Sequence, residues 1–525
     1  MRKFIVPLSL VFLFHASQFS VRAQTRPAAA AAPARPAAVT RPKLVLAVVI
    51  DQFRYDYLTR FRADFTGGLK RLLEQGAVFT DANYEHIPTV TAVGHSTFLS
   101  GATPAMSGII GNEWWDRETR KRVTSVSDDS TKLLGGSGTG SSPRRLLQST
   151  VGDELKMSGK GGKVIGVSIK DRSAILPAGH MADGAYWFDG KTGNFVSSSY
   201  YFAELPGWIS ELNASRPADK YAGREWMGHK MPAGGVELYG AVDASPFGNE
   251  LIQECALHAL SAEKLGAGAK IDLLAVSYSS NDYVGHRDGP DSPEVRDMAI
   301  RVDKLLGELI RAAEAQAGAG RVLVVLTADH GVVPVPEENE KRKMPGGRTT
   351  PAQQRDTVEK ALSARFGDGR WIADTSEGMV FNPDTVASHK ADWSEVERTA
   401  AEAIRALPHV FRVYTRTQLL NGWIANDLVD IRVRNGFNAA RSPNLIVISD
   451  PYWISGTSGT THGSPFDYDS HVPMLFLGAQ IQRGTYYRNV FPNDIAPTLA
   501  ALLEVETPSG SIGRVLDEML TRSRE

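Results

Sequence analysis

The chain has little of three features that mark particular classes of protein: cysteine, net charge and long hydrophobic runs. Among its 525 residues there is one cysteine, Cys255, so no disulfide can form within the chain. The 58 Lys and Arg are balanced by 59 Asp and Glu, which gives a formal net charge of -1. This balance provides no general electrostatic attraction to nucleic acid or to an anionic membrane. We therefore expect no nucleic acid as a structural partner.

The N-terminus has the pattern of a targeting segment. Met-Arg-Lys supplies positive charge, residues 4–14 are an apolar stretch, and Val-Arg-Ala before Gln24 fits a cleavage site. The apolar stretch is shorter than the ~20 residues that span a bilayer. We predict a signal peptide over residues 1–23, with an uncleaved membrane anchor as the alternative. Export of a large chain without disulfides fits a bacterial periplasm, and we expect no stable membrane span after cleavage.

The rest of the chain divides by composition into a linker and one domain with insertions. Residues 24–42 are rich in Ala and Pro and lack core-forming periodicity, which predicts a linker. Residues 43–525 are predicted to form the functional domain. Residues 183–246, rich in aromatic side chains, interrupt its pattern and predict an insertion that is either a lid or a stabilising cap. Residues 355–441 predict a second, α+β insertion.

Continuous apolar runs rich in β-branched residues alternate with helical patterns. Such runs predict strands buried on both faces of a parallel sheet, and the four clearest are residues 43–50, 163–169, 271–278 and 321–328. Residues 444–449 and 472–478 look like further strands. The spacing of Met298, Val302 and Leu306 predicts a helix over residues 292–316. The alternation predicts an α/β fold with a central, mostly parallel sheet flanked by helices.

Polar side chains end or closely follow these four strands. Asp51 and Lys170 end the first two, Asp282 follows the third within four residues, and Asp329 ends the fourth. In open α/β sheets, ligands bind outside the carboxyl ends of the strands. The sequence therefore places a site there.

Six residues in or near these positions are candidate metal ligands, namely Asp51, Asp282, His286, Asp329, His330 and His462. Three carboxylates and three imidazoles suit a pair of divalent ions, and zinc is the natural choice for mixed nitrogen and oxygen ligation. Taken singly each signal is weak, because an Asp after a strand is often a helix cap. Together they predict two divalent ions, which would clamp the attacking and leaving oxygens of an in-line displacement at phosphorus.

The motifs as a set resemble those of the alkaline phosphatase superfamily. The segments that carry the resemblance are, in order, VVIDQFRYDYL, PTVTAVGHSTFLSGATPAMSGIIGN, SIKDRSAI, SYSSNDYVGH, LTADHG and THGSPFDYDSHVPMLF. The branch that the chain is most similar to is the periplasmic alkaline phosphatases with a threonine nucleophile, which are relatives of the nucleotide pyrophosphatase/phosphodiesterases. The resemblance covers residues 43 to about 505.

By this resemblance, the motifs assign roles to several polar residues, most of them in the second motif. Thr91, in Thr-x-x-Gly-His, would be the nucleophile and a metal ligand, since metal coordination activates a hydroxyl. Asn112 would donate to a non-bridging phosphoryl oxygen. Thr89 is interpreted as a structural neighbour. His95 and His471 lie in the motifs but are interpreted as packing or supporting groups, not ligands.

The resemblance also divides the metal ligands between two ions. Those of the ion that activates Thr91 would be Asp51, Asp329 and His330. Those of the ion that stabilises the leaving oxygen would be Asp282, His286 and His462. The reaction implied is hydrolysis of a phosphate monoester through a covalent phosphothreonine intermediate.

Lys170 and Arg172 bear on the substrate class. A monoester presents an extra anionic oxygen, which a lysine and a forked guanidinium can pair with, whereas a diester carries a second ester group there. The pair therefore favours a phosphomonoesterase. A phosphodiesterase or nucleotide pyrophosphatase with the same metals is the alternative.

Other functions are less well supported by the sequence. A sulfatase is disfavoured because the motif set points to Thr91 as the nucleophile, and a phosphoglycerate mutase is disfavoured by the predicted export. A non-catalytic metal or phosphate binder is a distant alternative. The sequence predicts no particular oligomeric state.

Overall fold

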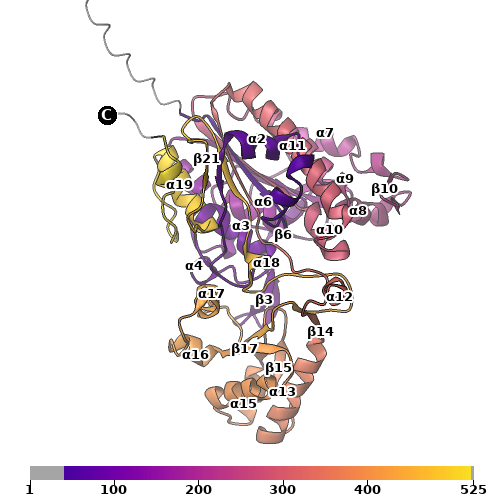
Figure 1. Cartoon of the computed structure of the whole chain (residues 1–525), viewed down its shortest axis with the longest axis vertical. Coiled ribbons are helices and arrows are strands. Elements are labelled where there is room, and N and C mark those ends of the chain that lie inside the picture. The colour runs from indigo at the N-terminus through magenta and orange to yellow at the C-terminus, as the bar shows by residue number, and fades with distance from the viewer. Residues whose placement is uncertain (1–40, 522–525) are drawn as a thin grey trace, which may run out of the picture. The chain divides into compact units, whose positions relative to one another are not determined.

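An eleven-stranded sheet is the central feature of the computed structural model, which describes residues 41–521 (Figure 1). The predicted signal peptide, residues 1–23, and nearly all of the predicted linker, residues 24–42, lie outside the described residues. The strand order is β21-β2-β20-β13-β1-β12-β7-β8-β9-β5-β6. Among residues 41–521, no helix combines the length and apolar character needed to cross a membrane.

The centre of the sheet is parallel, as predicted. Its five strands, in spatial order, are β13 (Val322–Thr327), β1 (Leu44–Ile50), β12 (Ile271–Tyr278), β7 (Gly161–Ser168) and β8 (Gly184–Asp189). In β1, Val48 lies opposite Val276 of β12 on one side and Leu326 of β13 on the other. The carboxyl ends of these strands therefore meet along one edge.

The flanks of the sheet are mostly antiparallel. On one side they are β20 (Met474–Leu477), β2 (Ala77–Phe79) and β21 (Gly484–Tyr486), and on the other β9 (Asn194–Ser198), β5 (Ser127–Leu134) and β6 (Thr139–Ser141). Only β2 and β21 run parallel to each other within these flanks. A short hairpin joins β8 to β9, and such a connection produces antiparallel neighbours, whereas parallel strands need a longer crossover. The α/β class is confirmed, with a parallel centre in a mixed sheet.

Helices cover both faces of the sheet because successive residues of β1 point to opposite sides. Leu46 and Val48 belong to one core cluster and Ala47 and Val49 to another. The first cluster includes side chains of α2 (Gly68–Gln75), α9 (Pro246–Ala262) and α11 (Pro293–Ala317). The second includes side chains of α3 (Thr91–Ser100), α5 (Val151–Met157) and α19 (Ile495–Leu503). The helix predicted over residues 292–316 is confirmed as α11.

The region 183–246 begins inside the main sheet, since β8 and β9 belong to it. The rest forms two α-helices, one 3-10 helix and a small hairpin. These are α7 (Gly207–Ala214), α8 (Gly235–Asp243), the 3-10 helix η3 (Asp219–Tyr221) and the strands β10 (Glu225–Trp226) and β11 (His229–Lys230). Many of its aromatic side chains, including Tyr186 and Trp226, are buried in the first core cluster. Its aromatic composition is therefore explained by packing.

The second insertion, predicted over residues 355–441, has a core of its own, and its elements extend beyond these bounds at both ends. Its elements are α13 (Pro351–Phe366), β15 (Ile372–Asp374), β16 (Val380–Phe381), α14 (Pro383–Ser388), α15 (Trp393–Arg405), β17 (Val410–Thr415), α16 (Arg416–Leu420), α17 (Leu428–Gly436) and β18 (Leu445–Ser449). In Figure 1, α13, α15, β15 and β17 cluster together. Trp371 and Phe381 are fully buried in this core. The predicted strand 444–449 is β18, which pairs with β17 and not with the main sheet.

Shorter elements connect these layers. They are α1 (Tyr57–Arg60), α4 (Pro104–Ser107), β3 (Glu113–Asp116), β4 (Lys121–Thr124), α6 (Asp171–Ala178), α10 (Ser280–Asp288), α12 (Pro336–Lys341), β14 (Gly347–Thr349), β19 (Trp453–Ser455) and α18 (Asp467–Ser470).

A buried carboxylate ties α11 to the start of α2. The two oxygens of Asp303 accept hydrogen bonds from four backbone N–H groups, those of Thr66, Gly67, Leu69 and Lys70, at 2.6–3.2 Å. These are donors that a helix N-terminus leaves without intrahelical partners. We expect D303A to lower the free energy of unfolding by about 3 kcal/mol, because buried donors lose a charged acceptor.

Urea denaturation followed by circular dichroism would measure this loss. The matched control is E308A, which removes an exposed carboxylate from the same helix. Equal stability of the two variants would contradict the assigned role of Asp303.

Candidate active site

The predicted site residues converge at the carboxyl edge of the parallel strands. Asp51 directly follows β1, and Asp329 and His330 follow β13. Asp282 and His286 lie one turn apart in α10, which follows β12, so both face the same side. All five belong to a cluster in which neighbouring side chains approach within hydrogen-bond or ligand distance.

The side chains form two overlapping groups with the spacing of metal ligands. In the first, ligand atoms of Asp51, Asp329 and His330 lie within 4.8 Å of one another, and in the second so do those of Asp282, His330 and His462. His286 Nε2 lies 3.2 Å from Asp282 Oδ1 and 3.2 Å from His462 Nε2. The structure therefore brings together all six predicted ligands, and His330 belongs to both groups.

Hydrogen bonds fix the orientation of the three imidazoles. The Nδ1 atoms of His286, His330 and His462 lie 2.7–2.9 Å from the carbonyl oxygens of Thr460, Gly331 and Thr89, respectively. A carbonyl can only accept, so each Nδ1 carries a proton, and in the neutral imidazole each Nε2 then keeps a lone pair. This tautomer is the one that binds a metal through Nε2.

The donor set fits a divalent cation. Asp51 Oδ1 and His330 Nε2 are buried, lie 3.5 Å apart and have no hydrogen-bond partner among the described residues. Buried polar atoms in native proteins are nearly always partnered, by protein groups, water or ions. Carboxylate and imidazole atoms arranged in this way suit zinc and similar ions.

Lys170 provides positive charge inside the cluster. Its Nζ donates to Asp51 Oδ2 and Asp282 Oδ2, both at 2.7 Å, and lies 3.4 Å from Thr91 Oγ1. Burial lowers the pKa of Lys170, but the carboxylates of Asp282 and Asp51 raise it more, so it lies above the ordinary value. The lysine is therefore charged beside the predicted nucleophile.

The aspartates differ in how well they are compensated. Burial, together with the nearby Asp329 carboxylate, raises the pKa of Asp51 to about 6. Burial also opposes ionisation of Asp282, but Lys170 and His286 hold its pKa well below the ordinary value. Asp51 is thus the carboxylate with the greatest need of a further positive charge.

Thr91 is the first residue of α3, and the backbone before it is extended. Its neighbour Ala92 donates its N–H to Asn112 Oδ1 at 2.9 Å. Since an N–H needs an acceptor, the amide oxygen of Asn112 is committed and its Nδ2 is left to donate. Thr89 Oγ1 donates to the Ser464 carbonyl at 3.0 Å, consistent with its interpretation as a structural neighbour.

Arg172 lies in the first turn of α6, two residues after Lys170. Its Nη1 is 3.8 Å from Asp171 Oδ1, and among the described residues its buried Nε has no hydrogen-bond partner. The guanidinium thus retains donors for an anionic ligand.

Comparison with known proteins identifies the family. A model of the type I phosphodiesterase / nucleotide pyrophosphatase family matches residues 45–471. The chain belongs to this family. Alkaline phosphatase PhoV of Synechococcus elongatus is 37% identical over 98% of this chain and 98% of PhoV. Alkaline phosphatase PafA of Elizabethkingia meningoseptica is 35% identical over 92% of this chain and 96% of PafA.

A crystal structure of wild-type PafA has a TM-score of 0.86 and 33% identity to this chain, and covers 92% of this chain and 100% of that one. The resemblance drawn from the motifs is therefore confirmed, and so is the α/β fold.

Two other histidines of this phosphodiesterase/nucleotide pyrophosphatase family member are already engaged by protein groups. His95 contacts the Thr91 carbonyl and Ser277 Oγ, both at 2.8 Å, through its two ring nitrogens. His471 contacts the Thr80 carbonyl at 2.9 Å and stacks on Tyr55 with ring centroids 4.4 Å apart. These contacts fit the interpretation that neither residue is a ligand.

Sequence reasoning missed two residues that contact the site. Gln52 donates from Nε2 to Asp282 Oδ1 at 2.6 Å and from its backbone to Asp329 Oδ1 at 3.1 Å. Glu377 Oε1 accepts from the Asn112 backbone at 3.2 Å. The position of Gln52 beside Asp51 was a weak signal for it, whereas nothing in the sequence pairs residues 112 and 377.

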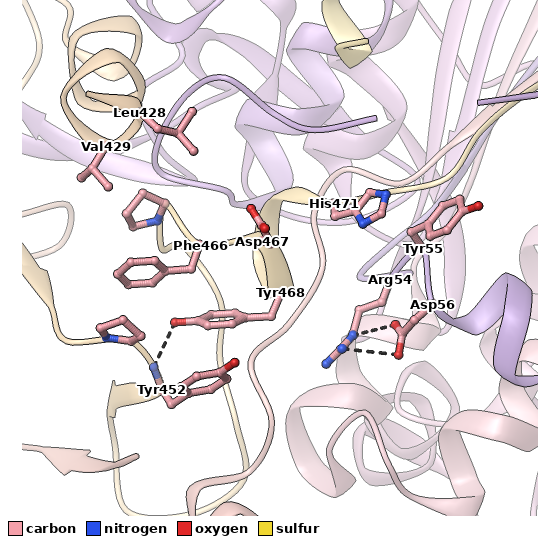
Figure 2. Close-up of a pocket in the computed structure, with 12 residues that line it drawn as sticks. Arg54, Tyr55, Asp56, Leu428, Val429, Tyr452, Phe466, Asp467, Tyr468 and His471 are labelled. Carbon is pink, nitrogen blue, oxygen red and sulfur yellow. Dashed lines mark hydrogen bonds and ion pairs between the residues drawn. The ribbon is translucent and has the colours of Figure 1, made fainter. Parts of the chain in front are cut away.

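A separate cleft lies next to the loop that follows His462. It encloses about 470 Å³, and its lining residues include none of the predicted site residues. Figure 2 shows the Arg54 guanidinium directed at Asp56, with Nε and Oδ1 2.8 Å apart. The Tyr468 hydroxyl accepts from the Tyr452 backbone at 3.1 Å. Arg54 is thus already paired with Asp56, and none of the metal-ligand candidates lines this cleft. The cleft is therefore distinct from the metal cluster.

Gly94 sets the distance between the nucleophile helix and a metal-ligand candidate. A Cβ on Gly94 would lie 2.2 Å from the Asp329 carbonyl oxygen and 2.6 Å from Asp329 Cβ. We expect G94A to lower kcat/KM at least about tenfold, because a small displacement of reacting groups is costly. The measurements are the steady-state hydrolysis of a phosphate monoester and the metal content of the purified variant.

The matched control is G240A, also in a helix, where an added Cβ meets no atom within 4 Å. If G94A kept full activity and metal content, close packing of α3 on Asp329 would not matter for the site.

Proposed function

We propose that this chain is an exported, metal-dependent alkaline phosphatase that hydrolyses phosphate monoesters. The observation that carries the proposal is the position of Lys170 Nζ, within 3.4 Å of Thr91 Oγ1 and 2.7 Å of two metal-ligand candidates. PhoV and PafA, which cover nearly the whole chain, are named alkaline phosphatases. Their names support a phosphatase over a diesterase.

Two divalent ions are the proposed cofactors, with zinc as the metal that the mixed donor set favours. One would be held by Asp51, Asp329, His330 and Thr91. The other would be held by Asp282, His286 and His462. When bound, the ions would lower the pKa of the nucleophilic hydroxyl and neutralise charge on the attacking and leaving oxygens.

Thr91 is the proposed nucleophile. Its Oγ1 forms a bond to phosphorus as the bond from phosphorus to the alcohol oxygen breaks, which gives a phosphothreonine. Water then cleaves the bond between phosphorus and Oγ1, releasing inorganic phosphate and restoring Thr91. The N-terminus of α3 presents its positive end to the phosphoryl group, and Asn112 Nδ2 donates to a non-bridging oxygen.

Lys170 and Arg172 are proposed to bind the remaining anionic oxygen of a monoester. Both contribute fixed positive charge, and the guanidinium can form two parallel hydrogen bonds. A diester has an ester group in place of that oxygen and would not form the charge-assisted hydrogen bonds that the anionic oxygen of a monoester forms with these two cations. The phosphodiesterase alternative uses the same metal ligands and Thr91.

Export to the periplasm is proposed from the N-terminal sequence. The predicted signal peptide over residues 1–23 supports it, and the single cysteine is compatible with a bacterial periplasm.

The nucleophile is tested by T91A. We expect kcat for p-nitrophenyl phosphate to fall by about 10³-fold or more, since the covalent route is lost. T91S, which keeps a hydroxyl, is the control and should retain much more activity and form a covalent phosphoenzyme detectable by mass spectrometry after acid quench. Full activity of T91A would exclude Thr91 as the nucleophile.

The substrate class is tested by the double variant K170A/R172A. The expected result is a fall of about 10²-fold or more in kcat/KM for p-nitrophenyl phosphate and a much smaller fall for bis-p-nitrophenyl phosphate, because only the monoester loses charge-assisted hydrogen bonds. K191A/R488A, which removes one exposed lysine and one exposed arginine, controls for the change in net charge. Equal losses for the two esters, or a wild-type preference for the diester, would favour the phosphodiesterase alternative.

A further inference from the structure

A second cleft opens directly onto the metal cluster. It encloses about 430 Å³, and its lining includes the metal-ligand candidate His462 and Val90, the residue before Thr91. Unlike the cleft of Figure 2, it is therefore lined by one metal-ligand candidate and by the residue next to the proposed nucleophile.

Part of the wall of this cleft is apolar, contributed by two parts of the chain, and it lies beside polar residues such as Ser376 and Ser442. Ile87 and Ile110 flank the nucleophile helix, whereas Ile446 and Ile448 belong to β18 of the second insertion. Apolar walls of this kind favour burial of a hydrophobic group over a hydrated one. The insertion thus contributes a surface that faces the reaction site.

In-line displacement places the leaving oxygen opposite the attacking one. Under the proposed function, Thr91 attacks, and His462, Asp282 and His286 would hold the ion that neutralises charge on the leaving oxygen. The alcohol is then expected to leave on the side of these ligands. His462 lines this cleft and a smaller one of about 190 Å³, and of the two only this cleft is also lined by Val90, next to Thr91.

Glu377 supplies negative charge to the same cleft. It lies between β15 and β16, and this segment is fixed by backbone hydrogen bonds between Met379 and Leu445 at 2.9 and 3.1 Å. Its Oε1 accepts from the Asn112 backbone, and a Cβ on Gly111 would lie 2.3 Å from its carboxyl group. Burial raises the pKa of Glu377 to about 8.

The residues that line the cleft include no Lys or Arg. Lys170 and Arg172, which are proposed to bind the phosphoryl group, are also absent from its walls. A negative charge on the alcohol would therefore find no lysine or arginine in the walls of the cleft and would lie near the Glu377 carboxyl group.

We propose that this cleft is the leaving-group subsite and that it selects uncharged aromatic or aliphatic alcohols over alcohols that carry negative charge. The proposal rests on the proposed phosphomonoesterase function and names the class of monoester that the site accepts best. The apolar wall provides the attraction, and Glu377 provides the discrimination against anions.

The test uses three unactivated esters of similar chemistry: methyl, benzyl and 4-carboxybenzyl phosphate. Benzyl phosphate presents an aromatic ring to the cleft, whereas methyl phosphate presents a single carbon. For each variant, the two ratios of kcat/KM, benzyl to methyl and 4-carboxybenzyl to benzyl, are compared with those of the full-length, metal-loaded wild type, so that differences in intrinsic reactivity cancel.

I446T keeps a β-branched residue in β18 and makes the wall more polar. We expect it to lower the benzyl-to-methyl ratio by about fivefold, the scale of a lost methylene contact. E377Q keeps an acceptor for the Asn112 N–H and removes the charge. We expect it to raise the 4-carboxybenzyl-to-benzyl ratio by about fivefold at pH 9, where the wild-type carboxyl group is ionised.

V410T is the matched control, because Val410 is a half-buried residue of the neighbouring strand β17 and does not line the cleft. It should leave both ratios as in the wild type. Ratios unaltered by I446T and E377Q would overturn the subsite while leaving the phosphatase intact. No turnover of any ester by the wild type would instead overturn the proposed function.

Discussion

The constraint on which the rest of the structure depends is the burial of three carboxylates in one cluster. Asp51, Asp282 and Asp329 are each at most 5% exposed, and burying several charges of one sign is costly unless cations accompany them. Lys170 compensates two of the three directly. The remaining negative charge, felt most by Asp51, is what makes the cluster a site for divalent ions.

The parallel centre of the sheet brings the residues of this cluster together. Because β13, β1 and β12 are adjacent and pair without a break in register, residues that follow them emerge side by side. The histidines come partly from elsewhere, and their Nδ1 atoms are held by carbonyls of loops, one of which directly precedes Thr91. Nucleophile and ligands are therefore positioned by shared hydrogen bonds, so a shift in one would be transmitted to the other.

The second insertion and the elements around the main sheet form different parts of the site. Strand ends and α3 form the part proposed to bind the phosphoryl group, while β18 and the segment around Glu377 border the space beyond it. Glu377 also contacts the backbone of Asn112, so the insertion touches both parts. A region with a hydrophobic core of its own can in this way contribute to specificity without supplying a proposed metal ligand.

The sequence by itself determined four of the five strands of the sheet centre, the helix α11 and the six candidate ligands, because apolar runs and strand-end polar residues are local patterns. It did not identify β8, which lies in the region predicted as an insertion. It did not determine that strand 444–449 pairs with β17, nor the antiparallel flanks, since strand partners are chosen by contacts between distant segments. Gln52 and Glu377 were likewise beyond local patterns: Gln52 reaches the carboxylates from a backbone conformation with φ of 58°, and Glu377 is brought to Asn112 from 265 residues away. Short motifs thus identify the residues that carry the chemistry. The residues that hold and surround them are determined only by the tertiary structure, because they come from distant segments that pack together in the buried interior.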